Sequence, residues 1–420
     1  GRPGPPGSRV AVIGLGRERR VMRILNCLDY YRPHYSGLTV YTERLARTLA
    51  GRGHHVTVLT SRYDPALPER ELMEGVRIRR VPVALRVSKG PVMPGFQTAG
   101  WRLLREHDLL HLHVPQPDAA LLAWMARLRG KPAVMTYHCD LRLPTSPVNA
   151  LTNLLAGAAN RIALGGVSVV VANARDYAET SPLLVHGLDK LEVIPPPIDV
   201  QPVMQGAREA LLARLGGTGR RPIIGMAARL ATEKGAEILA QAMPLILEQH
   251  PQAIVAYVGQ HEDVMGEDAY RARLQPLLAA LDDHWRFLGV LPESHMSAFF
   301  SLCDVTILPS LNRTESFGMV QAESMLCGTP VVASDIPGVG EPVRRTGMGL
   351  LVPPRQPRAL AEAVLEILRR PADFRRHRPA ALREFSAAAT ADRYEALFLR
   401  LLAEGAAPGA AGTRPGREGS

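Results

Sequence analysis

Hydrophobic and polar positions alternate in blocks along the chain, and the period of each block predicts its secondary structure. Short apolar runs such as HVTVLTS and VSVVVANA are typical of strands that are buried on both faces of a sheet. Between them lie segments in which apolar residues recur every three or four positions. In LTVYTERLARTLA, for example, Leu38, Tyr41 and Leu45 share one helical face. Gly51 then ends that predicted helix, so the chain consists of strand, loop and helix in repetition.

The same alternation occurs on both sides of a stiff segment near the middle of the chain. DLLHLHVP and PAVMTYHCD predict strands before it, and PIIGMAARL, AIVAYVG, RFLGV, DVTILPS and VVASD predict strands after it. The segment itself, VIPPPIDV, contains Pro195–Pro197 and cannot continue a helix. Alternation of this kind favours parallel sheets covered by helices on both faces. We therefore predict an α/β protein with two Rossmann-like, doubly wound domains and ligands bound in the cleft between them.

The length of the chain and its two ends set the expected boundaries. A chain of 420 residues is long for one core. We expect a first domain over residues 22–198 and a second over residues 199–387. Residues 1–21 and 404–420 are rich in Gly, Pro, Ala and Arg, which predicts a disordered leader and a disordered tail. The leader includes VAVIGLG, which lacks the third glycine of a dinucleotide fingerprint.

Charge and composition narrow the choice of partner. The chain is 46% hydrophobic and 21% charged, as is typical of a globular protein, but its net charge is +10. That charge favours an anionic partner, which is nucleic acid, an anionic membrane surface or a substrate that carries phosphate. Aromatic residues make up only 5% of the chain and the arginines are scattered, which disfavours nucleic acid.

The cysteines and the apolar segments indicate the compartment. The four cysteines are far apart among mostly apolar neighbours, which predicts reduced, buried thiols and no metal site. No run approaches the roughly 20 apolar residues of a membrane span, and no signal-peptide core is evident. We expect a cytoplasmic protein, and peripheral contact with the inner face of a membrane stays open.

The first candidate site lies in AARLATEKG. Arg229 and Lys234 occupy the loop between a predicted strand and the next helix. Two cations beside the free amides of a helix start form a natural seat for a phosphate or diphosphate. Solvated loop charges are the plain alternative. Lysine occurs at only four positions in this arginine-rich chain, however, and this favours a functional interpretation of Lys234.

The second candidate site is the stretch TESFGMVQAE, which places Glu315 and Glu323 eight residues apart. It follows the predicted strand DVTILPS, so Ser316 or Thr314 is expected to cap a helix from about Phe317 to Leu326. The amides at the start of that helix would point into the cleft, and Gly318 would allow a ligand to approach the backbone. By themselves, the two glutamates are equally compatible with a helix cap and a surface charge.

Together these segments resemble the donor site of the family 4 glycosyltransferases. The resemblance rests on ARLATEKG, ESFGMVQAE and GTPVVAS, and on SGLTVYTERLARTLAGRGHHVTVLTSR, TYHCD and IPPPID nearer the N-terminus. It extends from Met22 to about Leu402. It implies the GT-B arrangement of two Rossmann-like domains, with a C-terminal helix over residues 388–403 that packs back on the first domain.

The resemblance also implies a role for each candidate residue in binding a nucleotide sugar. Arg229 and Lys234 would hold the diphosphate, and Glu323 would accept hydrogen bonds from the ribose. Glu315 would bind hydroxyls of the transferred sugar. Further contacts are implied for the backbone of Phe317, Gly318 and Met319, for His138 beside the sugar, for Gly37 near the phosphate and for the backbone around Val290 at the base.

Two departures from the family pattern stand out. The family usually has two glycines where this chain has Ser36 and Gly37, and an Asn-Gly pair where it has Pro196 and Pro197. Gly37 still permits close approach of a phosphate, although the flexibility of the loop is in doubt. The prolines predict a stiffer hinge.

The implied reaction is the transfer of a hexose from a UDP- or GDP-sugar to a hydroxyl of a glycan or lipid acceptor. The resemblance implies retention of configuration, no metal and no cofactor beyond the nucleotide sugar as co-substrate. Since no carboxylate is clearly placed as a nucleophile, front-side displacement is the hypothesis. The alternatives are a phosphorylase or nucleotide-sugar epimerase of the same fold, and a non-catalytic basic binding protein. For membrane contact, the candidate patch is Arg77, Arg79, Arg80, Arg86 and Lys89, which would otherwise be a solvated strand face.

Overall fold

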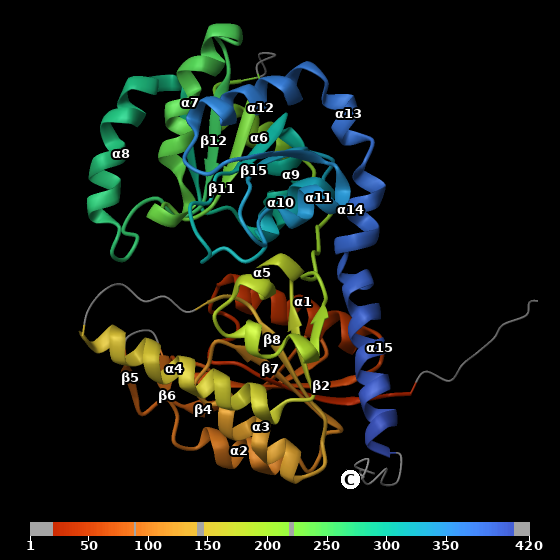
Figure 1. Ribbon diagram of the computed structural model, residues 1–420. Helices are drawn as coiled ribbons and strands as arrows, with labels where there is room; N and C mark the ends of the chain where they lie inside the picture. Colours follow the sequence, from red (N-terminus) through yellow and green to blue (C-terminus); the bar gives the residue numbers. More distant parts are fainter. Residues whose placement is uncertain (1–19, 88–89, 141–146, 218–221, 407–420) are drawn as a thin grey trace, which may run out of the picture.

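The computed structural model describes residues 20–87, 90–140, 147–217 and 222–406, which form two α/β domains (Figure 1). Each domain contains a predominantly parallel sheet with helices on both faces, so the predicted fold class is confirmed. Nearly all of the expected leader and tail, including the VAVIGLG segment, lies outside the described residues. The domain boundaries proposed above stay predictions.

The first domain is built on a sheet with the strand order β10-β9-β8-β7-β1-β2-β4-β3. Its strands pair in parallel except for β3, which is antiparallel to β4. The chain passes from β1 to β2 on one side and later to β7 on the other, so the strand order reverses between β1 and β7. The elements of this domain are β1 Arg23–Cys27, α1 Gly37–Gly51, β2 His55–Arg62, β3 Arg70–Met73, β4 Val76–Pro82, β5 Leu85–Val87, β6 Gly90–Val92, α2 Phe96–Leu103, β7 Leu109–Val114, α3 Ala119–Leu128, β8 Ala133–Tyr137, α4 Pro147–Gly166, β9 Val169–Ala172, α5 Arg175–Thr180, the 3-10 turns Leu184–His186 and Leu188–Lys190, and β10 Leu191–Val193.

The second domain is built on an all-parallel sheet with the order β13-β12-β11-β14-β15-β16. Here the strand order reverses between β11 and β14, and the loops that follow these two strands are therefore neighbours. The elements are α6 Ala207–Arg214, β11 Ile223–Ala227, the 3-10 turn η3 Thr232–Lys234, α7 Ala236–Gln249, β12 Ile254–Val258, α8 Asp268–Leu281, the 3-10 turn Asp282–His284, β13 Trp285–Gly289, α9 Glu293–Leu302, β14 Val305–Leu308, α10 Met319–Leu326, β15 Val331–Ser334, α11 Glu341–Thr346, β16 Gly349–Val352, α12 Pro357–Arg369, α13 Pro371–Arg375, α14 Arg378–Phe385 and α15 Ala387–Ala406.

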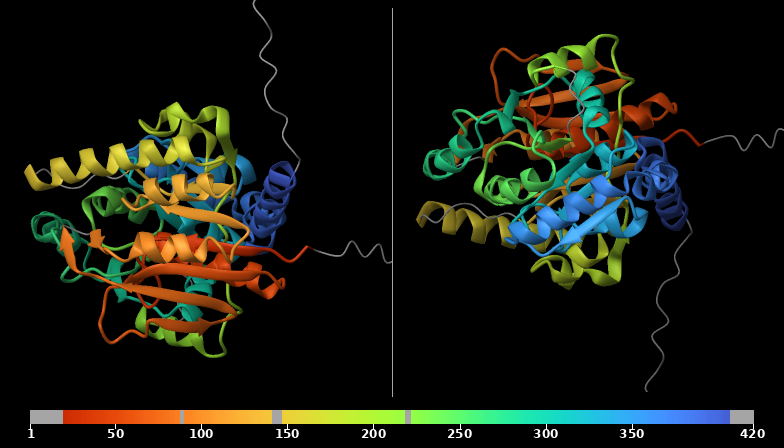
Figure 2. Two further views of the ribbon diagram at one scale, coloured as in Figure 1. Left: turned by 90° about the horizontal axis from the view of Figure 1, so that it is seen from below. Right: turned by 90° about the horizontal axis from the view of Figure 1, so that it is seen from above.

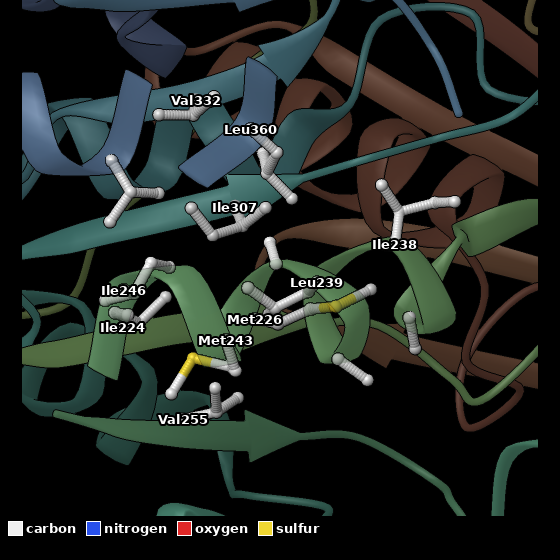
Figure 3. Packing of buried hydrophobic residues seen from close by; sticks show 14 of the residues in the cluster. Ile224, Met226, Ile238, Leu239, Met243, Ile246, Val255, Ile307, Val332 and Leu360 are labelled. Carbon is white, nitrogen blue, oxygen red and sulfur yellow. The ribbon is translucent and has the colours of Figure 1, made fainter. Parts of the chain in front are cut away.

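Strand alternation distributes the apolar side chains of the second sheet between two cores. Ile224 and Met226 pack with Val255 beneath α7 and α12, as Figure 3 shows. Ile223 and Ile254, one position earlier in each strand, belong to the core on the opposite face. Successive strand residues point to opposite faces, so each apolar run fills both cores. This pattern is the reason that continuous apolar runs correctly predicted buried strands.

The C-terminal helix α15 returns to the first domain (Figures 1 and 2). Its Tyr394 hydroxyl lies 2.8 Å from the hydroxyl of Tyr41 on α1 and 2.7 Å from Thr136 Oγ1 on β8. The chain crosses between the domains twice at one place, because Ile198 forms backbone hydrogen bonds of 2.9 Å with Phe385 and Ala387. The two crossings therefore lie side by side.

Candidate active site

The N-terminus of α1 in the first domain meets that of α10 in the second. Ser36 caps α1 by accepting a hydrogen bond of 3.2 Å from the amide of Thr39. A Cβ added at Gly37 would lie 3.5 Å from Met319 Cε, so the two helix starts are in van der Waals contact. The first amides of a helix have no partner within the helix and carry its positive dipole end. The domain interface therefore presents two such ends at one place, which suits an anion.

Gly318 is required by the backbone itself. Its φ is +76°, in the left-handed region, and a Cβ there would lie 2.2 Å from Leu308 Cδ2. Any other residue would strain the backbone and collide with β14. From the sequence, Gly318 was expected only to let a ligand approach the backbone. Its packing against Leu308 is an additional reason for glycine at this position.

The expected cap of α10 by Ser316 or Thr314 is wrong. Instead, Glu315 Oε1 accepts a hydrogen bond of 2.9 Å from the Gly318 amide, while Thr314 bonds to Asn312. The Gly318 amide is consequently not free for a ligand. The helix begins at Met319, two residues later than predicted. Glu323 therefore lies about 6 Å along the helix axis from its start.

Lys234 and Glu315 form an ion pair that joins the loops after β11 and β14. Lys234 Nζ lies 2.6 Å from Glu315 Oε2, and each side chain is 20% exposed. Gly235, at a φ of +70°, permits the two loops to meet, since a Cβ there would lie 2.2 Å from the carbonyl oxygen of Pro309. The structure thus brings Lys234, Glu315 and the start of α10 together at the point where the strand order reverses.

Arg229 lies in the same loop as Lys234 but its guanidinium contacts a different carboxylate. It donates a hydrogen bond of 2.6 Å to Glu233, and its side chain is 47% exposed. This arrangement leaves the Arg229 side chain at the solvent-facing side of the loop.

His138 lies directly after β8 and is buried. Its Nε2 lies 3.1 Å from Nδ1 of His113, and its ring packs edge-on against Tyr41. Burial lowers the pKa of His138 to about 3, so its imidazole is neutral near pH 7. The pKa of the adjacent Cys139 is raised to about 11, first by burial and then by the charge of Glu315. The segment after β8 therefore lies within electrostatic range of the Lys234–Glu315 pair.

Glu323 is neither free nor a surface charge. Its Oε1 accepts a hydrogen bond of 2.8 Å from Nη1 of Arg44, which is on α1 in the other domain. The sequence analysis missed Arg44. The available signal was its position three residues after Tyr41 and one before Leu45, which places a charge beside the apolar face of that helix.

The remaining predicted residues lie at the edges of this group. Val290 directly follows β13 and is 73% exposed. Phe317 is buried against Phe385, with ring centroids 5.6 Å apart, so only its backbone is available to a ligand.

An aromatic group in the first domain was not predicted. The rings of Tyr30, His34 and Tyr63 lie with centroids 4.7–5.8 Å apart, beyond the carboxyl ends of β1 and β2. Arg86 donates a hydrogen bond of 2.6 Å to the carbonyl oxygen of Tyr63. The rings come from separate segments, so no local pattern indicates their contact.

The basic patch expected at a membrane is smaller than predicted. Arg80 is buried, forms an ion pair of 2.7 Å with Glu71 and bonds to the carbonyl of Arg32. Lys89 lies outside the described residues. Arg77 and Arg79 remain on β4, where they line a surface hollow of about 70 Å³.

The described residues contain neither a candidate metal cluster nor a helix that could cross a membrane. Among the residues with described positions, no group of three or more His, Cys, Asp or Glu side chains is arranged to hold a metal ion. Over the same ranges, no helix has the length and apolar character needed to cross a bilayer.

The geometry defines a two-domain α/β enzyme of the GT-B class with an anion-receptive interface. Family models match residues 35–202 as "Glycosyltransferase Family 4" and residues 208–384 as "Glycosyl transferases group 1". The chain is 32% identical to the 2-deoxystreptamine N-acetyl-D-glucosaminyltransferase of Streptomyces fradiae, over 81% of this chain and 84% of the relative. It is 29% identical to D-inositol 3-phosphate glycosyltransferase 1 of Catenulispora acidiphila, over 82% and 85% respectively.

A solved structure agrees with the fold. The HepE protein of Anabaena in complex with UDP has a TM-score of 0.70 at 20% identity, covering 90% of this chain and all of its own. The chain belongs to the family 4 glycosyltransferases, whose C-terminal part is the group 1 model. It is therefore a glycosyltransferase, and the resemblance stated from the sequence is confirmed.

The geometry at Gly318 predicts a specific loss of stability. Gly318→Ala should lower the free energy of unfolding by about 2–5 kcal/mol, because left-handed strain of about 1–2 kcal/mol adds to overpacking against Leu308. Gly53→Ala is the matched control, since Gly53 has a φ of +93° with nothing within 4 Å of its Cβ position. Denaturant unfolding of both variants measures the difference. Equal losses would show that the neighbours of Gly318 relax without cost.

Proposed function

We propose that this enzyme transfers a hexose from a UDP- or GDP-sugar to a ring hydroxyl of its acceptor, with retention of configuration and without a metal ion. The observation that carries the proposal is the Lys234–Glu315 pair beside the start of α10. It places a cation, a carboxylate and unpaired helix amides at the reversal of strand order, where doubly wound domains bind nucleotides.

The ion pair suits a site that is filled by a diphosphate. Before binding, Lys234 and Glu315 neutralise each other at 2.6 Å. An arriving diphosphate would draw Lys234, together with the helix starts at Gly37 and Met319, onto its oxygens. Glu315 would then be free to accept hydrogen bonds from the sugar. Stabilisation of the leaving diphosphate by these groups is the electrostatic contribution to catalysis. The structural similarity to HepE, which was solved with UDP, supports a nucleotide donor.

The state of His138 and Glu315 supports front-side displacement. A histidine whose pKa is lowered to about 3 by burial is a weak base but an uncharged hydrogen-bond partner for a sugar hydroxyl. In the donor complex Glu315 would keep the hydrogen bond from the Gly318 amide on one oxygen and accept hydrogen bonds from sugar hydroxyls on the other, which makes it a poor nucleophile. We therefore infer that the departing phosphate takes the proton of the acceptor hydroxyl.

For the acceptor, we favour a hydroxylated six-membered ring, free or carried by a glycan or lipid. The names of the two relatives specify 2-deoxystreptamine and D-inositol 3-phosphate, which are both hydroxylated carbocycles. The rings of Tyr30, His34 and Tyr63 offer flat faces to the C–H side of such a ring. Arg86 beside them would suit a phosphate on it.

The rival functions have less support. A pyridoxal-phosphate phosphorylase would need a Schiff-base lysine, and Lys234, the one lysine after the domain join, is paired with Glu315. A nucleotide-sugar epimerase of the same fold is disfavoured because the relatives that this chain matches are named as glycosyltransferases. A non-catalytic binding protein is disfavoured by the family to which the chain belongs.

The donor proposal predicts stabilisation by one nucleotide. In a thermal-shift panel of UDP, GDP, ADP and their common sugar conjugates, the true ligand at about 100 times its Kd should add roughly 2.7 kcal/mol of stability. Glu323→Gln should lose most of this response. Glu362→Gln on α12, an exposed carboxylate paired with Arg358, is the control and should respond like wild type. Absence of any response in wild type, with and without magnesium, would refute the donor site.

The mechanism predicts no covalent intermediate. Intact-mass analysis after incubation with the donor that stabilises the protein should show the unmodified mass at every time point, because both oxygens of Glu315 would be occupied by hydrogen bonds from the Gly318 amide and the sugar hydroxyls. A mass increase of one hexose that is lost in Glu315→Gln would replace front-side displacement by double displacement.

Contact with a membrane is still a prediction, and it now rests on Arg77 and Arg79. If these side chains bind anionic headgroups, Arg77→Glu/Arg79→Glu should float with anionic vesicles much less than wild type. Arg358→Glu/Arg369→Glu on α12, whose arginine side chains are 85% and 63% exposed, controls for total charge. Equal flotation of all three proteins, or none for wild type, would remove the patch as a membrane contact.

A further inference from the structure

Arg44 connects the first domain to the carboxylate expected to bind the ribose. It lies in the middle of α1, and its Nη1 is 2.8 Å from Glu323 Oε1 on α10. Its Nη2 is 3.2 Å from Glu293 Oε1 at the start of α9. The Arg44 guanidinium therefore connects α1 of the first domain to both α9 and α10 of the second.

The position of Arg44 is costly for stability. Its side chain is only 4% exposed, and its Nε has no hydrogen-bond partner in the part of the chain that is described. Burial alone would lower the pKa of Arg44, but Glu323 and then Glu293 raise it, and the group stays charged. A buried ion pair with an unsatisfied donor is seldom more stable than apolar packing of similar volume. A role in binding accounts for a charge that stability alone does not require.

Other charges around Arg44 complete a network across the domain interface. Arg32 lies 3.5 Å from Glu293 and donates a hydrogen bond of 2.6 Å to Glu43. Tyr35 lies close as well, since its pKa is raised by burial and then by Glu323 and Glu293. Three carboxylates, those of Glu43, Glu293 and Glu323, thus share two guanidinium groups.

We propose that Arg44 is a positioning residue for the ribose of the donor, acting through Glu323. It holds Oε1 of that carboxylate, while Oε2 has no hydrogen-bond partner among the described residues. A carboxylate fixed by one oxygen presents the other in a single direction and has lost its rotational freedom before the ligand arrives. Two ribose hydroxyls would then find an acceptor that is already oriented. The inference rests on the proposed donor site.

This arrangement also couples the ribose to the relative position of the domains. Arg44 belongs to the first domain and Glu323 to the second. A movement that separates α1 from α10 would release the carboxylate and leave both charges without a partner. Because linkage is reciprocal, a bound ribonucleotide should favour the arrangement in which the two helices are in contact.

The test compares ribose with its dideoxy form. Kd values for UDP, GDP and their 2′,3′-dideoxy analogues are measured by titration calorimetry on wild type and Arg44→Gln. For the nucleotide that binds, Arg44→Gln should weaken the ribose form about tenfold, equivalent to about 1.4 kcal/mol, and the dideoxy form less than about twofold. A merely structural role would weaken both forms equally.

Arg47→Gln is the matched control. Arg47 lies one turn further along α1 and pairs with Asp199 after the domain join and with Glu74, away from Glu323. Arg47→Gln should leave the Kd values of the ribose and dideoxy forms unchanged. Arg44→Lys is a second variant in case Arg44→Gln unfolds. The lysine ammonium group can still pair with Glu323, although it lacks the planar guanidinium of arginine. Arg44→Lys should retain most of the preference for ribose over the dideoxy form.

The outcomes separate this inference from the proposed function. If wild type prefers the ribose form and Arg44→Gln keeps that preference, the donor site stands and the role of Arg44 is refuted. If Arg44→Gln is unfolded and Arg44→Lys weakens both forms equally, the role is also refuted. If wild type binds neither nucleotide, the donor site fails, and the inference about Arg44 fails with it.

Discussion

The ion pair between Lys234 and Glu315 is the interaction on which the candidate site depends. It joins the loops after β11 and β14, which are adjacent only because the strand order reverses there. Glu315 also accepts a hydrogen bond from the Gly318 amide, and α10 begins at the next residue, Met319. The Glu315 carboxylate therefore contacts both the loop after β11, through Lys234, and the start of α10, through Gly318. The glycines at 235 and 318 make this geometry possible, since a Cβ at either would overlap neighbouring atoms.

In the described part of the chain, polar contacts join the domains at several separate places. Arg44 bridges α1 to α9 and α10. On the other side of α10, Tyr177 donates a hydrogen bond of 3.3 Å to the carbonyl of Arg313, and the Gly338 amide donates one of 3.0 Å to Asp176. The paired chain crossings at Ile198 lie elsewhere. An interface made of such polar contacts holds two domains less firmly than a large apolar one, so relative movement of the domains is expected.

Much of the fold was predictable because buried parallel strands have a strong apolar signal. Runs such as that at Ile223–Ala227 were found from their pattern, whereas the antiparallel edge β3 and the β5–β6 hairpin carry too few apolar residues to stand out. The residues of the site likewise fall into two groups, those in local sequence motifs and those that come together only in the fold. Lys234 and Glu315 lie in local motifs at strand ends. The pairing of Arg44 with Glu323 joins positions 279 residues apart, and the cap at Gly318 depends on which rotamer Glu315 adopts. Neither is encoded in a local pattern.

Lys234 and Arg44 each hold a glutamate of the same motif, but the two ion pairs differ in what a ligand can do to them. Lys234 is 20% exposed and ends in a single ammonium group on a flexible chain, so phosphate oxygens can replace Glu315 at little cost. Arg44 is 4% exposed and its planar fork is shared between two carboxylates. Displacing it would leave a buried charge uncompensated, which is far more costly. The lysine is therefore suited to exchange its carboxylate for the substrate, and the arginine to keep its carboxylate in place.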